Sequence, residues 1–263
     1  MSLITNRSNV YLMSPSAKYD DIMTPWHTFM EKDFTIYLKS KILVNKLDTK
    51  SHAFMLSRNG KHAGITTYKD DESNMHVSFT YWFWKPNLTQ APDGGTVYDN
   101  PTPIQKTITY TLLPQHKDQF NEYAITCHHL RRKISFYVNS ELVGEIDYQG
   151  LDKCSYKEAY MWLGCGNMVT EIEDHRNVGE YEYELFFCLD KFISLEDVDD
   201  LKKNYRTSYV DDYFDLPILN SKTPHKDNIC FFLNFDQKTE YKLWNLCFNG
   251  CYANFYIENN TMF

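Results

Sequence analysis

The sequence predicts an all-β protein, an antiparallel β-sandwich with one short α-helix. Aromatic residues make up 16% of the 263 residues, from 20 Tyr, 17 Phe and 5 Trp, and aromatic residues favour strands. Apolar and polar residues alternate with period two in roughly a dozen short runs, which turn residues separate. One segment has a helical period. Strands do not alternate with helices, so a parallel α/β fold is not expected.

The first predicted strands lie in the N-terminal half of the chain. Residues 34–44 alternate apolar with polar side chains. Residues 53–56 and 63–68 form a predicted hairpin, because Asn59-Gly60 between them favours a type I′ turn. Residues 77–84 are a further strand. We expect a long loop after it, marked by Pro86, Pro92, Gly94, Gly95, Pro101 and Pro103.

The rest of the chain continues the pattern of strands. The clearest hairpin joins residues 134–138 to residues 142–148 through the turn Asn139-Ser140-Glu141. Four other runs are predicted strands: residues 107–112, 120–127, 159–163 and 181–189. An acidic loop precedes the last of them.

One amphipathic helix is predicted near residue 200. Ser194 is its N-cap and Asp197 completes a variant of the capping box. Leu195, Val198, Leu201 and Tyr205 fall on one face, so the helix is expected to lie flat on the sandwich. Three last strands are predicted at residues 229–235, 241–247 and 252–257.

Charge and composition exclude several classes of protein. A net charge of −8, from 35 acidic and 27 basic residues, argues against a nucleic-acid or anionic-membrane partner. No run approaches the about 20 apolar residues of a membrane span, and residues 1–13 do not resemble a signal peptide. We therefore expect a soluble protein, cytoplasmic or virion-associated. Seven cysteines are an odd, thinly spread set, so mostly buried free thiols are expected.

Several segments together carry a family resemblance. In chain order they are residues 31–36 (EKDFTI), 121–126 (NEYAIT), 134–144 (ISFYVNSELVG), 159–164 (AYMWLG) and 192–198 (FISLEDV). Their order and spacing resemble the laminin G-like (LamG) modules of the concanavalin A-like lectin/glucanase superfamily. The resemblance spans about residues 31–205. It implies a jelly-roll sandwich that acts as a non-catalytic recognition module.

Residues 1–263 are predicted to form a single domain. Phe235-Asp236, Trp244-Asn245 and Asn249-Gly250 are similar to the segment that opens a LamG module, yet they lie near the C-terminus. A segment this short cannot bury enough apolar surface to form a second sandwich. We therefore expect residues 225–263 to pair into the sheets of the same domain.

Aromatic and polar residues around the predicted loop suggest a glycan-binding site. Flat aromatic rings stack on the C–H face of a pyranose, while carboxylates and amides hold its hydroxyls. The alternative is that the aromatic residues belong to the core and the loop is ordinary. The candidate residues are Tyr81, Trp82, Trp84, Asp93, Tyr98, Asp99 and Asn100.

Other clusters of polar residues are candidates for different chemistry. Glu171, Glu173 and Asp174 supply hard oxygen ligands for a possible Ca²⁺ site, or form a hydrated acidic loop. Glu145 and Asp147 share a strand face, as do the paired carboxylates of glycoside hydrolases on this fold. Gln149 stands where that pattern needs a third acid, so no catalytic residue is assigned. The basic residues His128, His129, Arg131, Arg132 and Lys133 mark either a contact for an acidic partner or a solvated turn.

Three classes of function remain open at this point. The first is a lectin-like, non-catalytic module that binds a glycan or a protein partner through rim loops or the concave sheet. The second is a structural protein of a virion or another assembly, in which a homo-oligomer is expected. The third is a polysaccharide hydrolase or lyase, which requires two carboxyl groups in an open cleft.

Overall fold

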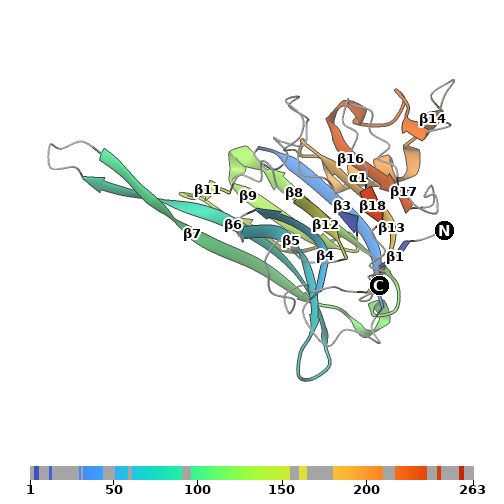
Figure 1. Ribbon diagram of the computed structural model, residues 1–263, viewed down its shortest axis with the longest axis horizontal. Helices are drawn as coiled ribbons and strands as arrows, with labels where there is room; N and C mark the ends of the chain where they lie inside the picture. Colours follow the sequence, from blue (N-terminus) through green and yellow to red (C-terminus); the bar gives the residue numbers. More distant parts are fainter. Residues whose placement is uncertain are drawn as a thin grey trace, which may run out of the picture.

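The computed structural model describes residues 3–5, 12–13, 30, 32–43, 51–58, 61–90, 96–154, 160–164, 180–209, 217–235, 242–243 and 255–257. These residues form two antiparallel sheets that pack face to face, together with one α-helix (Figure 1). The all-β antiparallel sandwich with a single short α-helix is therefore confirmed for the described part of the chain. No helix there is long and apolar enough to cross a membrane.

The first sheet has seven strands. Its order is β1 (Leu3–Thr5), β13 (Tyr181–Leu189), β3 (Phe34–Ile42), β8 (Phe120–His128), β9 (Lys133–Val138) and β10 (Glu141–Asp147), and β16 (Ile229–Asn234) also pairs with β13.

The second sheet has nine strands. Its order is β11 (Asp152–Lys153), β6 (Met75–Gln90), β5 (Lys61–Lys69), β4 (Ser51–Arg58), β12 (Tyr160–Leu163), β2 (Leu12–Met13), β18 (Phe255–Ile257) and β17 (Lys242–Leu243), and β7 (Thr96–Thr111) also pairs with β6. A separate small hairpin joins β14 (Thr207–Tyr209) to β15 (Pro217–Leu219). The described residues also include three 3-10 turns: η4 (Pro114–His116), η5 (His129–Arg131) and η7 (Lys226–Asn228).

The main core lies between the two sheets. Alternation along each strand places one set of side chains inward, because successive side chains point to opposite faces. Ring contacts then join the sheets, for example between Phe79 of β6 and Phe136 of β9, whose centroids are 5.9 Å apart. Within this core the hydroxyl of the buried Tyr183 donates a hydrogen bond to the carbonyl oxygen of Ala53 at 2.8 Å.

A second core lies between the first sheet and helix α1 (Leu195–Asn204). The Ser194 hydroxyl accepts a hydrogen bond from the Asp197 backbone amide, and the Asp197 carboxylate accepts one from the Ser194 amide, so the predicted capping box is confirmed. Val198 and Leu201 face the sheet and are buried against it. The helix therefore covers part of the outer face of the first sheet.

The two hairpins predicted from turn residues are present in the structure. Asn139 and Ser140 both have positive φ, of 50° and 67°, and close the predicted hairpin between β9 and β10. Asn59 and Gly60 lie outside the described residues. Arg58 pairs with Lys61, so β4 and β5 form the predicted hairpin on either side of them.

The prediction of a long loop after residue 84 is wrong for the residues that the structure describes. β6 continues to Gln90 and β7 begins at Thr96, and Pro103 pairs with Trp84 in the register between them. Proline is tolerated here because a two-stranded ribbon has free edges, and Pro86 lies at a register shift between Lys85 and Asn87. Figure 1 shows this hairpin projecting from the body of the sandwich as an arm.

The C-terminal part of the chain contributes strands to both sheets. β16 pairs with β13 in the first sheet, from Leu185↔Asn234 to Leu189↔Ile229. In the second sheet β18 pairs with β2 and with β17. The predicted strand at residues 241–247 is described at Lys242–Leu243, and residues 244–247 lie outside the described part.

Candidate functional site

The outward side of the β6–β7 hairpin brings together the tryptophans of the predicted glycan site. Inward residues of β6 are fully buried, from Met75 to Phe83 in steps of two. The intervening residues point away from the core, and each has a partner directly across on β7. We call these outward side chains the hairpin face: His76, Ser78, Thr80, Trp82 and Trp84 on β6, and Thr111, Thr109, Thr107, Gln105 and Pro103 on β7.

Hydroxyl groups form the middle of the hairpin face. Ser78 and Thr109 are hydrogen-bonded through their hydroxyls at 3.0 Å, and so are Thr80 and Thr107. Such cross-strand pairs of β-branched and hydroxyl side chains stabilise an antiparallel sheet. The pairs hold both strands in one register, and thereby fix the position of the tryptophans farther along β6.

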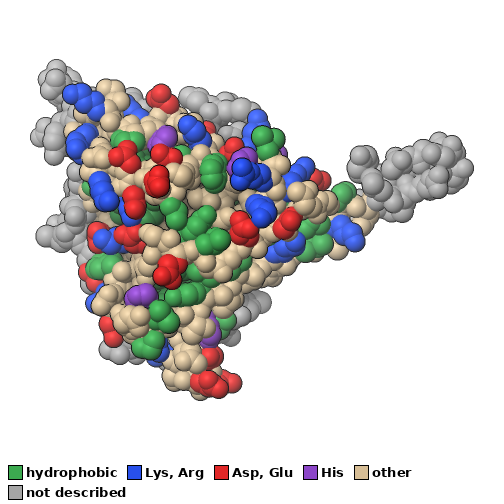
Figure 2. All heavy atoms as spheres, turned by 180° about the vertical axis from the view of Figure 1, so that it is seen from behind, with side chains coloured by type: hydrophobic (Ala, Val, Ile, Leu, Met, Phe, Trp, Pro, Cys, Tyr) green, Lys and Arg blue, Asp and Glu red, His purple; other side chains and the backbone are tan. Residues whose placement is uncertain are grey.

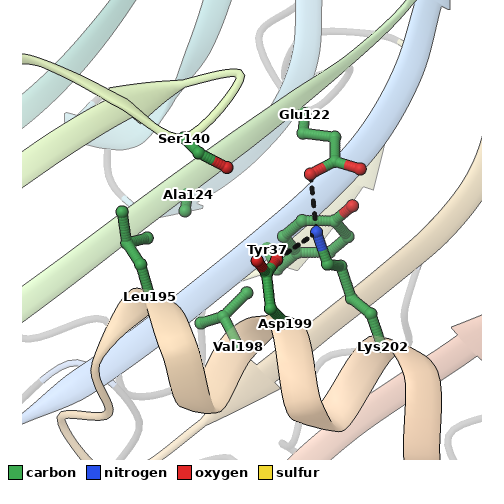
Figure 3. A pocket seen from close by; sticks show the side chains of 8 residues that line it. All are labelled: Tyr37, Glu122, Ala124, Ser140, Leu195, Val198, Asp199 and Lys202. Atoms are coloured by element: carbon green, nitrogen blue, oxygen red, sulfur yellow. Dashed lines mark hydrogen bonds and ion pairs between the residues drawn. The ribbon is translucent and has the colours of Figure 1, made fainter.

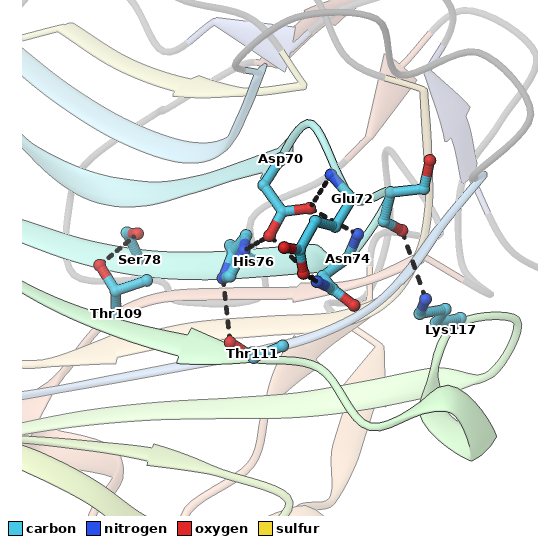
Figure 4. A network of polar contacts seen from close by, with 9 residues as sticks. Asp70, Glu72, Asn74, His76, Ser78, Thr109, Thr111 and Lys117 are labelled. Carbon is cyan, nitrogen blue, oxygen red and sulfur yellow. Dashed lines mark hydrogen bonds and ion pairs between the residues drawn. The ribbon is translucent and has the colours of Figure 1, made fainter.

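One end of the hairpin face is anchored by the turn between β5 and β6 (Figure 4). The Asp70 carboxylate accepts hydrogen bonds from the backbone amides of Glu72 and Asn74 and pairs with His76 Nε2 at 2.8 Å. His76 Nδ1 lies 3.1 Å from the Thr111 hydroxyl. The hydrogen bond to His76 is the largest of several contacts that lower the pKa of Asp70 to about 2. These contacts satisfy Asp70 within the turn, so the turn is structural.

We expect the contribution of Asp70 to the stability of the fold to be lost in acid. The pKa of this carboxyl is about 2 in the folded chain and about 3.9 when unfolded. The ionised group therefore stabilises the fold fully above about pH 4, and the gain disappears as the pH falls through about 2. Thermal melts of the wild type and of Asp70→Asn should differ near neutral pH and converge by about pH 2. A difference that is unchanged at pH 2 would contradict this account.

The two tryptophans occupy the other end of the hairpin face. Trp82 pairs with Gln105, and Trp84 pairs with Pro103 on one side and with Asp152 of β11 on the other. Both indoles are half-buried, with one part packed against the core. The Asp152 side chain is 70% exposed and its carboxylate lies 4.0 Å from Arg132. An aromatic pair, a carboxylate and an amide thus share one outward surface, which we call the tryptophan platform: Trp82, Trp84, Gln105 and Asp152.

The other predicted glycan residues are distributed differently. Tyr81 points inward, is fully buried and directs its hydroxyl towards the carbonyl oxygens of Met30 and Cys154, so it belongs to the core. Tyr98 and Asp99 lie in β7 opposite Leu88 and Asn87, and Asn100 follows in the same strand. Their side chains, and the whole of Asp93, lie outside the part of the structure that is described.

The predicted calcium ligands Glu171, Glu173 and Asp174 also lie outside the described residues. Among the residues that are described, no group of three or more His, Cys, Asp or Glu side chains is placed to hold a metal ion. The calcium site remains a prediction.

Glu145 of β10 does not have the properties of the general acid of a glycosidase. Glu145 is held by Lys133 at 2.7 Å and by the Ser135 hydroxyl at 3.0 Å. The hydrogen bond from Lys133 lowers the pKa of Glu145, whereas a general acid needs a raised pKa. Asp147 accepts a hydrogen bond from the backbone amide of Gln149. This geometry agrees with strand acids on a solvated surface.

A small pocket lies between helix α1 and the first sheet (Figure 3). Lys202 Nζ lies 2.6 Å from both Glu122 and Asp199 and 5.1 Å from the centroid of the Tyr37 ring. Burial alone would lower the pKa of Lys202, but these two carboxylates outweigh it and raise it. The ion pair with Glu122 of β8 links the helix to the sheet, whereas the pair with Asp199 lies within the helix, so the pocket is part of the second core. Its lining also includes Ala124, Ser140, Leu195 and Val198.

The basic residues between β8 and β9 are partly neutralised by neighbouring acids. Lys133 pairs with Glu145, and Arg132 approaches Asp152. Leu130 in the same turn is 87% exposed. On the face seen in Figure 2, acidic and basic side chains are interspersed with hydrophobic ones, so this view shows no continuous basic stripe of the kind that marks a nucleic-acid site.

Two members of the tryptophan platform were missed in the sequence. Asp152 and Gln105 lie 68 and 21 residues from Trp84, and neither stands in a recognisable motif. Strand register alone brings them beside the tryptophans. A strand at residues 152–153, two residues long, gives no periodic signal in the sequence.

No family model and no curated protein matches this sequence. Solved structures do resemble it in shape. A candidate carbohydrate-binding protein from Bacteroides ovatus matches with a TM-score of 0.51 at 12% identity, over 98% of this chain and 60% of that chain.

Two further solved structures resemble the chain less closely. The CBM40 of Ruminococcus gnavus IT-sialidase bound to α2,3-sialyllactose matches with a TM-score of 0.44 at 10% identity, over 74% of this chain and 95% of that chain. A heptameric SAP-like pentraxin from Limulus polyphemus matches with a TM-score of 0.43 at 9% identity, over 75% and 80%. The two-sheet antiparallel topology and the similarity to the Bacteroides ovatus protein together show a jelly-roll β-sandwich, the fold that the resemblance to LamG modules implied.

Proposed function

We propose that this protein is a non-catalytic recognition module that binds a glycan at the tryptophan platform. The observation that carries the proposal is the presence of Trp82 and Trp84 on one outward surface with Asp152 and Gln105 beside them. Indole rings stack on the apolar face of a pyranose, and a carboxylate and an amide hold its hydroxyl groups. The hydroxyl pairs hold the strands that carry these side chains in one register, which lowers the entropy cost of ordering the platform around a ligand.

The fold agrees with this proposal without deciding it. A solved structure that shares the fold with a TM-score of 0.51 is described as a candidate carbohydrate-binding protein. One fold supports many functions, so the ligand class is argued here from the platform residues. Glu171, Glu173 and Asp174 remain candidates for a calcium ion that supports binding.

A glycan array tests the proposal, with the purified protein in calcium and in chelator. We expect binding to a defined glycan, and about a 30-fold loss of affinity in Trp84→Ala, the size of effect that truncating a central aromatic contact produces. Asp152→Asn should weaken binding less, because it removes one charge and keeps the shape of the side chain. Phe192→Ala is the matched control, since Phe192 is an exposed aromatic residue on another part of the surface, beside His128.

The results separate glycan recognition from its alternatives. Equal loss in Trp84→Ala and Phe192→Ala, or no loss in either, would contradict the platform as the site. If the protein instead binds a protein partner, and Trp84→Ala and Asp152→Asn weaken that binding, the platform is still the binding site but its ligand is a protein.

The arm favours a second candidate function, that of a structural or assembly component. Beyond Trp84 the described strands β6 and β7 pair only with each other, and two-stranded ribbons are marginally stable in water. A partner that covers the arm would stabilise it. Size-exclusion chromatography with light scattering, run on the array sample, tests this: a stable oligomer without glycan binding would favour assembly over recognition.

A further inference from the structure

Cys127 and Lys153 lie against each other between the two sheets. Cys127 ends the inward row of β8 in the first sheet, and Lys153 lies in β11 of the second sheet. The distance from Cys127 Sγ to Lys153 Nζ is 3.5 Å. Cys127 is fully buried and Lys153 is half-buried. The two side chains therefore meet where neither is freely solvated.

The amine of Lys153 lies in an unusual environment for a lysine. Its Nζ contacts the carbonyl oxygen of Lys32 and lies 5.1 Å from the centroid of the Phe34 ring. Within the described part of the chain, no carboxylate comes within ion-pair distance of it. Burial lowers the pKa of Lys153 and so increases the share of neutral amine. A neutral amine has the lone pair that makes lysine a nucleophile.

The thiol is held by a second set of contacts. Cys127 Sγ lies 3.7 Å from the Tyr148 hydroxyl, which in turn lies 3.3 Å from His129 Nδ1. Burial raises the pKa of Cys127, so the thiol is neutral at rest. Lys153 Nζ, 3.5 Å from the sulfur, is placed to take its proton. These contacts fix the sulfur next to the nitrogen.

We propose that Cys127 and Lys153 form a modification site, at which hydrogen peroxide produces a covalent sulfur–nitrogen bond between the two sheets. Lys153 takes the thiol proton, and the thiolate attacks one peroxide oxygen. The O–O bond breaks, and the hydroxide that leaves takes a proton from Lys153 to become water. The product is the sulfenic acid of Cys127, in which sulfur has lost two electrons to the peroxide.

The second step joins the two side chains. The neutral amine of Lys153 attacks Cys127 Sγ, the S–O bond breaks, and the departing hydroxide leaves as water with one proton from the nitrogen. The linked product, a sulfenamide, has two hydrogen atoms fewer than the starting pair. A thiol reductant reverses the bond: its thiolate attacks sulfur, releases the lysine amine and forms a mixed disulfide, which a second thiol reduces. Peroxide is close to water in size and reaches the sulfur through local opening of the fold.

Peptide mapping by mass spectrometry tests the proposal on the full-length protein. After treatment with hydrogen peroxide we expect a cross-linked peptide that contains both residues, about 2 Da lighter than the sum of its parts. Dithiothreitol should separate the two peptides again. A disulfide also removes two hydrogens, but it would link two cysteine peptides. Recovery of Cys127 as the sulfinic acid, about 32 Da heavier and unlinked, would overturn the proposal.

Two variants and a stability measurement make the test specific. Lys153→Arg keeps the positive charge but lacks a nucleophilic amine, so the link should be lost. Cys230→Ala is the control that should leave the link intact, because the recorded hydrogen bond of the Cys230 thiol is to the carbonyl oxygen of Asn228. The link closes a loop between residues that are 26 positions apart and should raise the Tm of the treated wild type by about 5 °C or more. The same rise in Lys153→Arg would contradict the proposed bond.

Discussion

Deleting residues 225–263 is expected to give insoluble protein. The deletion removes β16, whose five residues from Ile229 to Leu233 are all buried, together with β17 and β18. β16 pairs with residues 185–189 of β13. In the second core the ring of Phe232 stacks on the ring of Phe187, and their centroids are 5.5 Å apart. Loss of these contacts exposes an apolar strand edge, which promotes aggregation. Solubility after expression and a thermal melt of any soluble fraction measure the effect.

A shorter deletion provides the control. A chain that ends at residue 257 retains every described strand, so it should stay soluble and melt cooperatively. A soluble 1–224 chain with a cooperative melt would show that the C-terminal residues are dispensable. It would then contradict our proposal that residues 1–263 form a single domain.

Gly64→Ala is expected to destabilise the protein by about 3 kcal/mol, at the upper end of what overpacking costs. A Cβ atom at this position in β5 would lie 2.3 Å from the carbonyl oxygen of Phe54 in β4. The register of these strands shifts between His52 and Phe54, directly beside this close contact. Because the obstacle is backbone, no side-chain rotation relieves it. The Tm should fall by roughly 6–12 °C.

Gly150→Ala is the matched control for this substitution. Gly150 has a φ of +70°, and a Cβ atom there has nothing within 4 Å. The cost is then limited to the left-handed backbone, about 1 kcal/mol. Equal shifts in the two variants would contradict the close approach at Gly64. Glycan binding by the two variants should also be compared, because Gly64 pairs with Thr80, which lies next to the tryptophan platform.

Local patterns in the sequence predicted most elements of the sandwich. Alternation placed Phe34, Ile36 and Leu38 on the buried face of β3, as the structure shows. Ser194 and Asp197 located the start of the helix, and Asn139 with Ser140 located a hairpin turn. These features depend on backbone preferences and on neighbours within about four residues, so the sequence carries them directly.

The arm shows where local patterns were misleading. Prolines at 86, 101 and 103 predicted a loop, because proline removes a backbone donor from a sheet. The structure instead has two long paired strands, since a ribbon with free edges leaves positions where that donor is not needed. The prediction failed because the composition of a segment does not reveal whether its edges are covered.

The sequence by itself determined the fold class, the helix, the main turns and the identity of the tryptophans as candidates for ligand contact. Only the tertiary structure decided which of these aromatics are available: Tyr81 faces the core, while Trp82 and Trp84 face outward. It also placed Asp152 beside Trp84 and Lys153 against Cys127. The physical reason is that pairing between distant strands depends on register and on the packing of two sheets, and neither is encoded in the spacing of residues along one segment.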